Sequence, residues 1–173
     1  MSSLQEFLAI RRAISLWEGR ADAELGAVHG LGLSEFGALF HLAEAPGGRL
    51  RRVDLARRLA VTPSGVTRLL APLERRHIVG RETDGQDARS TYAVLTKSGR
   101  SLVKDATVTA VAVADDILGS LPKADRVAFN PPRSLEPLFD QYGLDSTRTA
   151  GSTRRYRSEP FLTAARRGSL QGV

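Results

Sequence analysis

The sequence predicts a mainly helical fold of the α+β class, in which two long helices flank a lobe of short helices and one β-hairpin. Apolar residues recur at every third or fourth position through most of the first 121 residues, which is the period of amphipathic helices. Two β-prone segments within residues 78–96 enclose a turn-rich stretch, which predicts the hairpin. A chain of 173 residues, 42% of them hydrophobic, suffices for one globular domain with appendages.

Residues 4–28 are predicted to form the first long helix. Seven apolar residues in this range follow one another at intervals of three or four, so they form a single stripe along one face. Glycines at positions 30 and 32 end the pattern, as expected beyond a helix C-terminus. The stripe consists of Phe7, Ile10, Ile14, Trp17, Ala21, Leu25 and Val28.

A second helix is expected to begin with Ser34 as its N-cap, because a serine hydroxyl accepts a hydrogen bond from a free backbone N–H at a helix start. Phe36, Leu39 and Phe40 form its apolar side, and the Pro-Gly-Gly sequence at 46–48 ends it. Residues 49–51 are too few to assign to a helix or a strand.

The next two predicted helices are joined by a tight connection at Val61 and Thr62. The first covers residues 54–60. Thr62 has the side chain of an N-cap, and Pro63 suits the first helical position, where its missing N–H breaks no bond. The buried face of the second helix is expected to carry Val66, Leu69, Leu70 and Leu73.

The opposite face of that second helix is predicted to be exposed. It carries hydroxyl and guanidinium groups, from Ser64, Thr67, Arg68 and Arg75. Pro72 lies in the same helix and removes the hydrogen bond to the carbonyl of Arg68, so a kink is expected there.

Residues 78–82 and 90–96 are predicted to pair as an antiparallel hairpin around the turn-rich sequence Asp-Gly-Gln-Asp at 84–87. Arg89 lies at its tip. Just before the hairpin, His77 occupies a position where a helix usually ends on a left-handed glycine, and histidine is one of the few other residues that adopt this conformation.

Thr96 is predicted to cap a second long helix that runs to about residue 121. Residues 107–113 are rich in β-branched side chains, but the helical period continues on both sides of them, so we predict helix throughout. A short helical segment is expected at 123–129. The last 44 residues contain 17 Gly, Pro, Ser or Thr without an apolar period, which predicts a basic, disordered tail.

The net charge of +6 is concentrated in the centre of the chain. Residues 49–89 contain ten arginines and five acidic residues, a net charge of +5. Such a cluster is the pattern expected of a nucleic-acid-binding surface. A helix-turn-helix followed by a hairpin is the element order of a winged helix-turn-helix, in which the second helix fits the DNA major groove and the hairpin reaches the minor groove.

Residues 54–99 resemble the winged helix-turn-helix and the following L-T-x-x-G motif of the MarR family of bacterial transcriptional regulators. The block reads DLARRLAVTPSGVTRLLAPLERRHIVGRETDGQDARSTYAVLTKSG, and the resemblance extends over residues 4–129. It implies a MarR-like domain at 1–129, with dimerisation helices at 4–30 and 97–129 and a winged helix-turn-helix at 34–96, followed by the tail at 130–173.

The resemblance also implies roles for individual residues. Ser64, Thr67 and Arg68 match positions that read the major groove. Arg89 matches the wing arginine that enters the minor groove, and Asp87 matches the acid that orients it. With the neighbouring polar and basic residues, the predicted DNA-binding set is Thr62, Ser64, Thr67, Arg68, Arg75, Arg81, Asp87 and Arg89.

Three positions depart from the family pattern. Gln86 stands where the family often has a further arginine, which weakens the charge of the wing. His77 replaces a common glycine, and Pro72 stands where some members carry another DNA-contacting residue. The base preference of relatives therefore does not transfer to this chain.

The resemblance further implies a homodimer that acts as a ligand-responsive repressor on a pseudo-palindromic operator of double-stranded DNA. A small-molecule effector would bind between the dimer helices and the DNA-binding lobe, near Trp17, Phe36, Phe40 and His41, although each of these residues is equally explained as core. Family members usually end with a full interface helix. The stretch after residue 130 is either a natural extension or the product of an altered reading frame.

Two other classes of function fit the sequence less well. A winged helix that serves as a protein-interaction module without an operator has no need for Arg68 and Arg89 to project together. An enzyme is not expected, because no catalytic triad, phosphate loop or metal-ligand spacing is present, and the three histidines lie on separate elements. The chain has no cysteine, no apolar run of membrane length and no signal peptide, so we expect a cytoplasmic protein without cofactor, metal or membrane partner.

Overall fold

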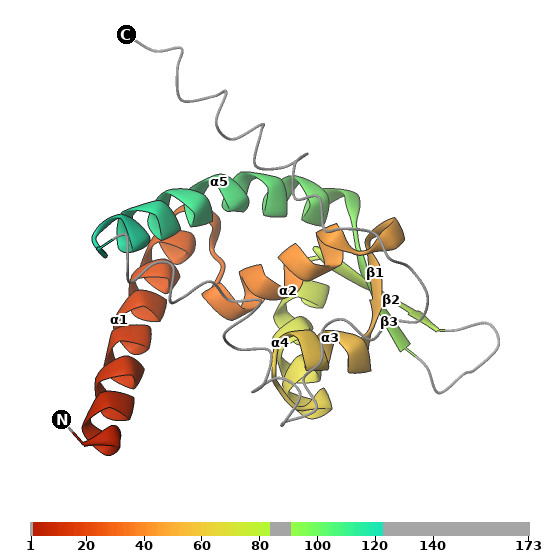
Figure 1. Cartoon of the computed structure of the whole chain (residues 1–173). Helices are drawn as coiled ribbons and strands as arrows, with labels where there is room; N and C mark the ends of the chain where they lie inside the picture. The colour runs from red at the N-terminus through yellow and green to blue at the C-terminus, as the bar shows by residue number, and fades with distance from the viewer. Residues whose placement is uncertain (1, 84–90, 123–173) are drawn as a thin grey trace, which may run out of the picture.

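The structure, a computed structural model, describes residues 2–83 and 91–122 and consists of two long helices beside a smaller lobe (Figure 1). This arrangement confirms the predicted mainly α fold with a small sheet. The predicted segment 123–129, the tail from residue 130 and the wing residues 84–90 lie outside the described residues. The elements in order are α1 (Ser3–His29), α2 (Leu33–Glu44), a 3-10 turn (Pro46–Gly48), β1 (Arg49–Arg51), α3 (Arg52–Arg58), α4 (Pro63–Arg75), β2 (Val79–Thr83), β3 (Thr91–Leu95) and α5 (Lys97–Gly119).

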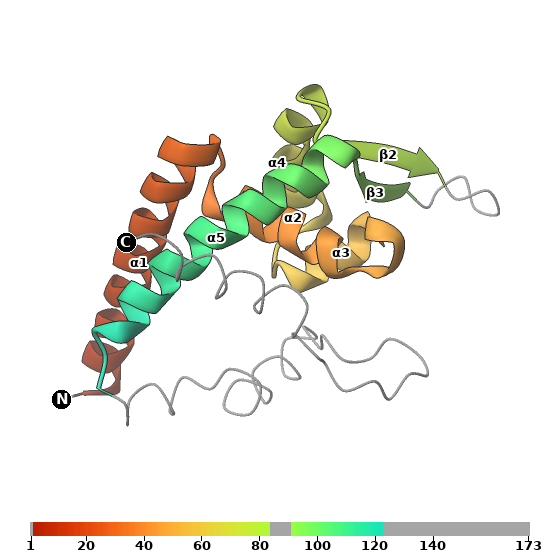
Figure 2. The same ribbon diagram turned by 90° about the horizontal axis from the view of Figure 1, so that it is seen from above.

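The two long helices lie side by side, and α2 sits between α5 and the α3–α4 pair (Figures 1 and 2). Two polar contacts join the long helices. Arg20 on α1 forms an ion pair with Asp116 on α5, with 2.6 Å between Nη2 and Oδ2. His29 Nε2 lies 2.8 Å from the hydroxyl of Thr109.

Helix α1 follows its predicted range but not its predicted burial. Ser2 accepts a hydrogen bond from the N–H of Gln5, and Gly30 ends the helix in the left-handed conformation, at φ +62°. Of the seven residues in the apolar stripe, only Ala21 and Leu25 are buried. The N-terminal half of the stripe is therefore an apolar surface that the described residues leave uncovered.

The start of α2 corrects the prediction that Ser34 is its N-cap. The helix begins at Leu33, and Gly32 is the N-cap. The Glu35 carboxylate accepts a hydrogen bond from the Gly32 N–H at 3.0 Å, and Asp22 of α1 accepts one from the Leu33 N–H at 2.5 Å. Because these two carboxylates satisfy the free N–H groups, the helix starts before the serine.

The sheet has one strand more than the predicted hairpin. Strands β2 and β3 pair antiparallel as expected, with Val79 opposite Leu95, and β1 pairs with the other edge of β3, with Leu50 opposite Ala93. A three-residue strand has no sequence period of its own. It is defined by the partner strand, which lies more than forty residues later in the chain.

The core of the lobe is aliphatic and continuous. It joins α2, α3, α4 and the sheet to the C-terminal part of α1 and the middle of α5. The fully buried large side chains are Leu25, Leu31, Leu39, Leu42, Leu55, Val66, Leu70 and Leu73.

The start of α5 is held on the base of the hairpin. Thr96 caps the helix as predicted by accepting a hydrogen bond from the Gly99 N–H at 3.0 Å, and its hydroxyl lies 2.8 Å from the His77 carbonyl. His77 has φ +55°, which confirms its left-handed conformation. Gly99 packs so closely on the backbone carbonyl of Ile78 that a β-carbon there would overlap it.

Candidate nucleic-acid interface and adjoining cavity

The sharp connection between α3 and α4 is built from local signals. Ala60 adopts a left-handed conformation at φ +53°, which turns the chain after α3. Thr62 accepts a hydrogen bond from the Gly65 N–H at 3.1 Å, and Pro63 occupies the first position of α4. The predicted cap of this helix is confirmed.

Helix α4 presents the predicted polar face to solvent. Ser64, Thr67, Arg68 and Arg75 are all exposed, whereas the opposite face enters the core. The Thr67 hydroxyl donates to the Pro63 carbonyl at 3.1 Å. The guanidinium groups of Arg68 and Arg75 make no hydrogen bond or ion pair with another residue in the described ranges 2–83 and 91–122. Their guanidinium groups are therefore available to an external anion.

A partly buried ion pair fixes the position of α4. Arg52, at the start of α3, is only 10% exposed and donates a hydrogen bond to the carboxylate of Glu74, near the end of α4. Burial lowers the pKa of Arg52, the Glu74 carboxylate opposes that shift, and the positive charge of Arg81 adds to it. The pair links the two helices of the helix-turn-helix at the point where the hairpin begins.

The C-terminal end of α4 is also tied to the turn between the first two helices. The Arg76 guanidinium donates to the Gly30 carbonyl at 2.9 Å. The helix continues through Pro72 to Arg75 as one element. The kink expected at Pro72 remains a prediction.

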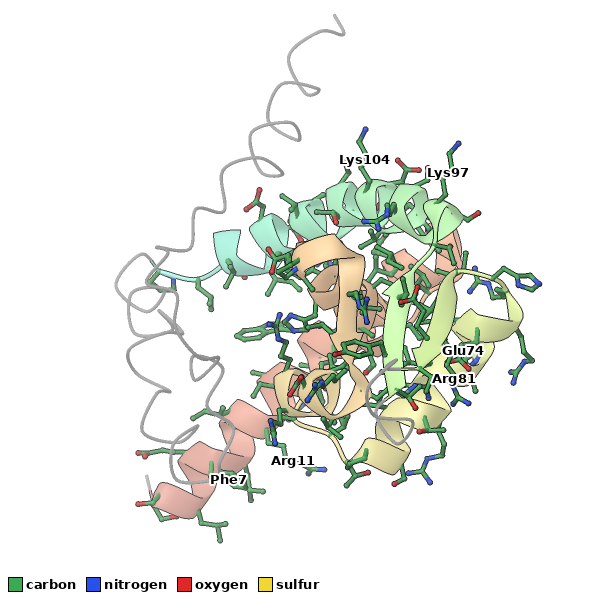
Figure 3. The ribbon with its side chains drawn as sticks, turned by 90° about the vertical axis from the view of Figure 1, so that its right-hand side faces the viewer. Phe7, Arg11, Glu74, Arg81, Lys97 and Lys104 are labelled. Atoms are coloured by element: carbon green, nitrogen blue, oxygen red, sulfur yellow. The ribbon has the colours of Figure 1, made fainter. Side chains whose placement is uncertain are left out.

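The described part of the hairpin adds one exposed arginine to this surface. Arg81 on β2 lies near Glu74, on the opposite side of the lobe from Lys97 and Lys104, which project from α5 (Figure 3). On the edge strand β1, Arg49 forms an ion pair with Glu82 at 3.6 Å, and its guanidinium lies over the ring of Tyr92. The two predicted wing residues, Asp87 and Arg89, lie outside the described residues.

A cavity of about 530 Å³ opens between α1, α2 and α5. Three of the four residues predicted near an effector, Trp17, Phe36 and Phe40, line it. His41 does not, because each helical residue is rotated by about 100° from the one before, which turns His41 away from the face shared by Phe36 and Phe40. His41 instead has a buried Nδ1 with no partner among the described residues, and burial lowers its pKa.

Sequence reasoning missed two residues of the cavity. Glu18 and Glu44 line it and are both exposed, so their carboxylates lie at its mouth. A signal for Glu44 was present, because it continues the spacing of four that relates Phe36 to Phe40. Glu18 directly follows Trp17 and is four residues after Ile14.

In residues 2–83 and 91–122, no three His, Asp or Glu side chains gather as the ligands of a metal ion would. The helices in these ranges include none that has both the length and the apolar character needed to cross a bilayer.

Comparison with known sequences places the centre of the chain in a described family. Residues 29–90 match a model of the MarR family. The chain is 36% identical over 109 residues to the HTH-type transcriptional repressor Rv2887 of Mycobacterium tuberculosis, an alignment that covers 63% of this chain and 76% of that protein.

Solved structures of related regulators share the fold. Sco3205, a MarR family transcriptional regulator from Streptomyces coelicolor crystallised in complex with DNA, is 26% identical with a TM-score of 0.69, over 83% of this chain and 88% of that one. AbsC, a MarR family regulator from the same organism, has a TM-score of 0.73 at 21% identity, over 84% of this chain and 98% of that one.

Proposed function

The chain belongs to the MarR family of transcriptional regulators, and we propose that it is a repressor that binds double-stranded DNA as a homodimer and responds to a small-molecule ligand. The name of the mycobacterial relative supports repression, and the DNA complex of the Streptomyces regulator supports DNA as the partner.

The exposed face of α4 is the observation that carries the proposal. Between Leu59 and Leu73 the chain has no acidic residue, so nothing on this face repels a phosphate backbone. The positive end of the α4 helix dipole, at its N-terminus, also favours an anion there. An exposed arginine on a helix in the major groove donates two hydrogen bonds to the edge of a guanine, and we assign this role to Arg68. Ser64 and Thr67 lie beside it for shorter contacts.

The other basic residues are assigned to the DNA backbone. Arg75 and Arg81 are both exposed, one at the end of α4 and the other on β2. Guanidinium groups at such places position a protein on phosphates without reading bases. The family resemblance assigns Arg89 to the minor groove and Asp87 to its orientation. Thr62 contributes by capping α4 and so fixing the helix end that faces DNA.

The uncovered apolar stripe of α1 supports the homodimer. Phe7, Ile10 and Ile14 are 63%, 52% and 43% exposed, and Phe7 lies on the N-terminal part of α1, away from the lobe (Figure 3). Contiguous exposed apolar residues of this kind mark an interface. A two-fold dimer would hold two copies of α4 about 34 Å apart, which is one turn of DNA and demands a pseudo-palindromic operator.

The cavity supports the response to a ligand. Helix α2 carries Phe36 and Phe40 on the cavity and contacts α4 with its other side. A ligand that separates α2 from α1 and α5 therefore moves α4 relative to the proposed dimer interface. Such a ligand lowers operator affinity only if it binds the DNA-bound conformation more weakly than the free conformation.

Selection of bound sequences from a random DNA pool, with the full 173-residue chain, tests the proposal. We expect a two-fold symmetric consensus and an affinity that falls steeply with salt. A pool without enrichment at low salt would contradict operator binding and favour a protein-interaction module.

Single substitutions then test the residue assignments. We expect Arg68→Ala and Arg89→Ala each to weaken binding to the selected operator by roughly 1 to 3 kcal/mol, and Arg68→Ala to relax the preference at particular base pairs. Lys104→Ala is the matched control, because this exposed cation lies on α5, away from α4 (Figure 3). Equal losses in all three variants would show that only overall charge matters.

A further inference from the structure

The described residues that line the cavity between α1, α2 and α5 carry charge of one sign. Among the described residues that line it, the ionisable ones are Glu18 and Glu44; lysine, arginine and histidine are absent from that set. Both glutamates are exposed, whereas Leu25 and Phe36 in the same lining are buried. The cavity therefore has an apolar floor and a negatively charged mouth.

An anionic ligand is disfavoured at this place. Two uncharged polar groups belong to the described lining residues: the Thr107 hydroxyl, which already donates to the Val103 carbonyl at 2.6 Å, and the indole N–H of Trp17. A carboxylate or phenolate that entered would therefore lose its hydration and find at most one donor, the indole N–H, among these side chains. It would also lie close to the charges of Glu18 and Glu44, which repel it.

A hydrophobic cation is favoured in this cavity. Its charge is attracted by the two carboxylates at the mouth while its apolar body leaves water for the floor. The rings of Trp17, Phe36 and Phe40 line the cavity, and aromatic faces attract cations. A volume of about 530 Å³ lies within the range of pockets that hold drug-sized molecules.

We propose that this cavity binds hydrophobic monocations, molecules with an aromatic or aliphatic body and one ammonium or phosphonium charge, and discriminates against anions of the same shape. As an identification of the regulatory ligand this rests on the proposed function, because it names the chemical class of the effector. The binding preference itself depends only on the lining of the cavity.

Tetraphenylphosphonium and tetraphenylborate are suitable probes, because they share four phenyl groups and a similar size but carry opposite charges. Trp17 is the single tryptophan of the chain and lines the cavity, so its fluorescence reports binding directly. With the full-length protein we expect tetraphenylphosphonium to change this fluorescence saturably, with one ion bound per chain. The borate is expected to bind at least tenfold more weakly.

Charge-neutralising variants test the role of the mouth. Glu18→Gln and Glu44→Gln should each weaken tetraphenylphosphonium binding roughly three- to tenfold and narrow the difference between the two ions. Glu24→Gln is the matched control, since Glu24 is exposed on α1 but does not line the cavity. Ala110→Phe, which fills the cavity without changing charge, should abolish binding. A thermal unfolding transition confirms that each variant is folded.

Three results would each overturn the inference. They are equal affinity for the two ions, failure of both ions to bind, and Glu18→Gln and Glu44→Gln variants that bind tetraphenylphosphonium as the Glu24→Gln control does. Titration of operator DNA on the same samples separates the two proposals. A protein that binds operator but neither ion refutes the cation site alone, whereas one that binds the cation with unchanged operator affinity supports the site and refutes regulation through it.

Discussion

The lobe and the N-terminal half of α1 have the same helical period of apolar residues, but these residues are buried in the lobe and exposed on α1. In the lobe, Leu39, Leu55 and Leu70 are fully buried, because α2, α3, α4 and the sheet cover one another. On α1, Phe7 and Ile10 continue an equally regular stripe and remain more than half exposed. Periodicity thus identifies the apolar face of a helix but not what covers it. The described residues leave this face of α1 uncovered, and in the proposed homodimer a second chain covers it.

The largest expected effect, on dimerisation and operator affinity, comes from substituting exposed residues of the α1 stripe. The double variant Phe7→Glu/Ile10→Glu should be monomeric by light scattering, because it places two charges on the proposed interface. Its operator affinity should fall about a hundredfold or more, since the second α4 no longer binds at the high effective concentration that a dimer provides.

Arg12→Glu is the control for that variant. It changes the net charge by the same two units but lies on the opposite face of α1, about 180° from the centre of the stripe. A double variant that stays dimeric, or a control that becomes monomeric as readily, would contradict the assignment of the stripe to the interface.

The next largest effect comes from damaging the lobe. Leu70→Ala removes a fully buried side chain from α4 and should lower the free energy of unfolding by about 2 to 5 kcal/mol. Val53→Ala, at a half-exposed position of α3, should lower it by less than about 1 kcal/mol. Urea unfolding at a fixed protein concentration measures both. Similar values for the two variants would mean that the lobe is not packed as described.

A smaller loss is expected from the ion pair that joins the two helices of the lobe. Glu74→Gln leaves the partly buried Arg52 charge without its counter-charge and should cost about 2 kcal/mol in urea unfolding, less than a fully buried pair because Glu74 is 28% exposed. The double variant Arg52→Met/Glu74→Leu should recover most of this loss. If it is no more stable than Glu74→Gln, the charge is not the cause.

The smallest expected effect is a pH dependence from His41. Burial, and then the positive charge of Arg58, lower the pKa of His41 below its usual 6.5, and Glu44 partly opposes them. The unfolded chain therefore takes up this proton first as the pH falls. Stability contributed by neutral His41 is therefore fully present above about pH 6.5 and is lost progressively as the pH falls below it. Urea unfolding between pH 7.5 and 5.5 should show a smaller pH slope in His41→Gln, and an unchanged slope would exclude this residue as the source.

Local features of the sequence predicted local features of the fold. Thr62 and Thr96 cap the expected helices, and His77 has the expected positive φ, because each depends on bonds within a few residues. Ser34 was wrong as a cap because the decisive acceptor, Asp22, comes from another helix. Strand β1 was missed for the same reason, since its partner lies far along the chain.

The candidate site divides in the same way. The exposed face of α4 was predictable from its helical period, which separates Ser64, Thr67 and Arg68 from the buried leucines. The bond from Arg76 to Gly30 and the acidic mouth of the cavity were not predictable, because they depend on how helices distant in the sequence meet.

The close contact between Gly99 and the Ile78 carbonyl has a genetic consequence. Every missense change of a glycine codon adds at least a β-carbon, and at this position there is no space for one. No single substitution at residue 99 is therefore conservative. A replacement is tolerated only together with a second substitution at the base of the hairpin. Among naturally varying copies of this gene, position 99 should be constant even where the exposed residues beside it, Lys97 and Ser98, change freely.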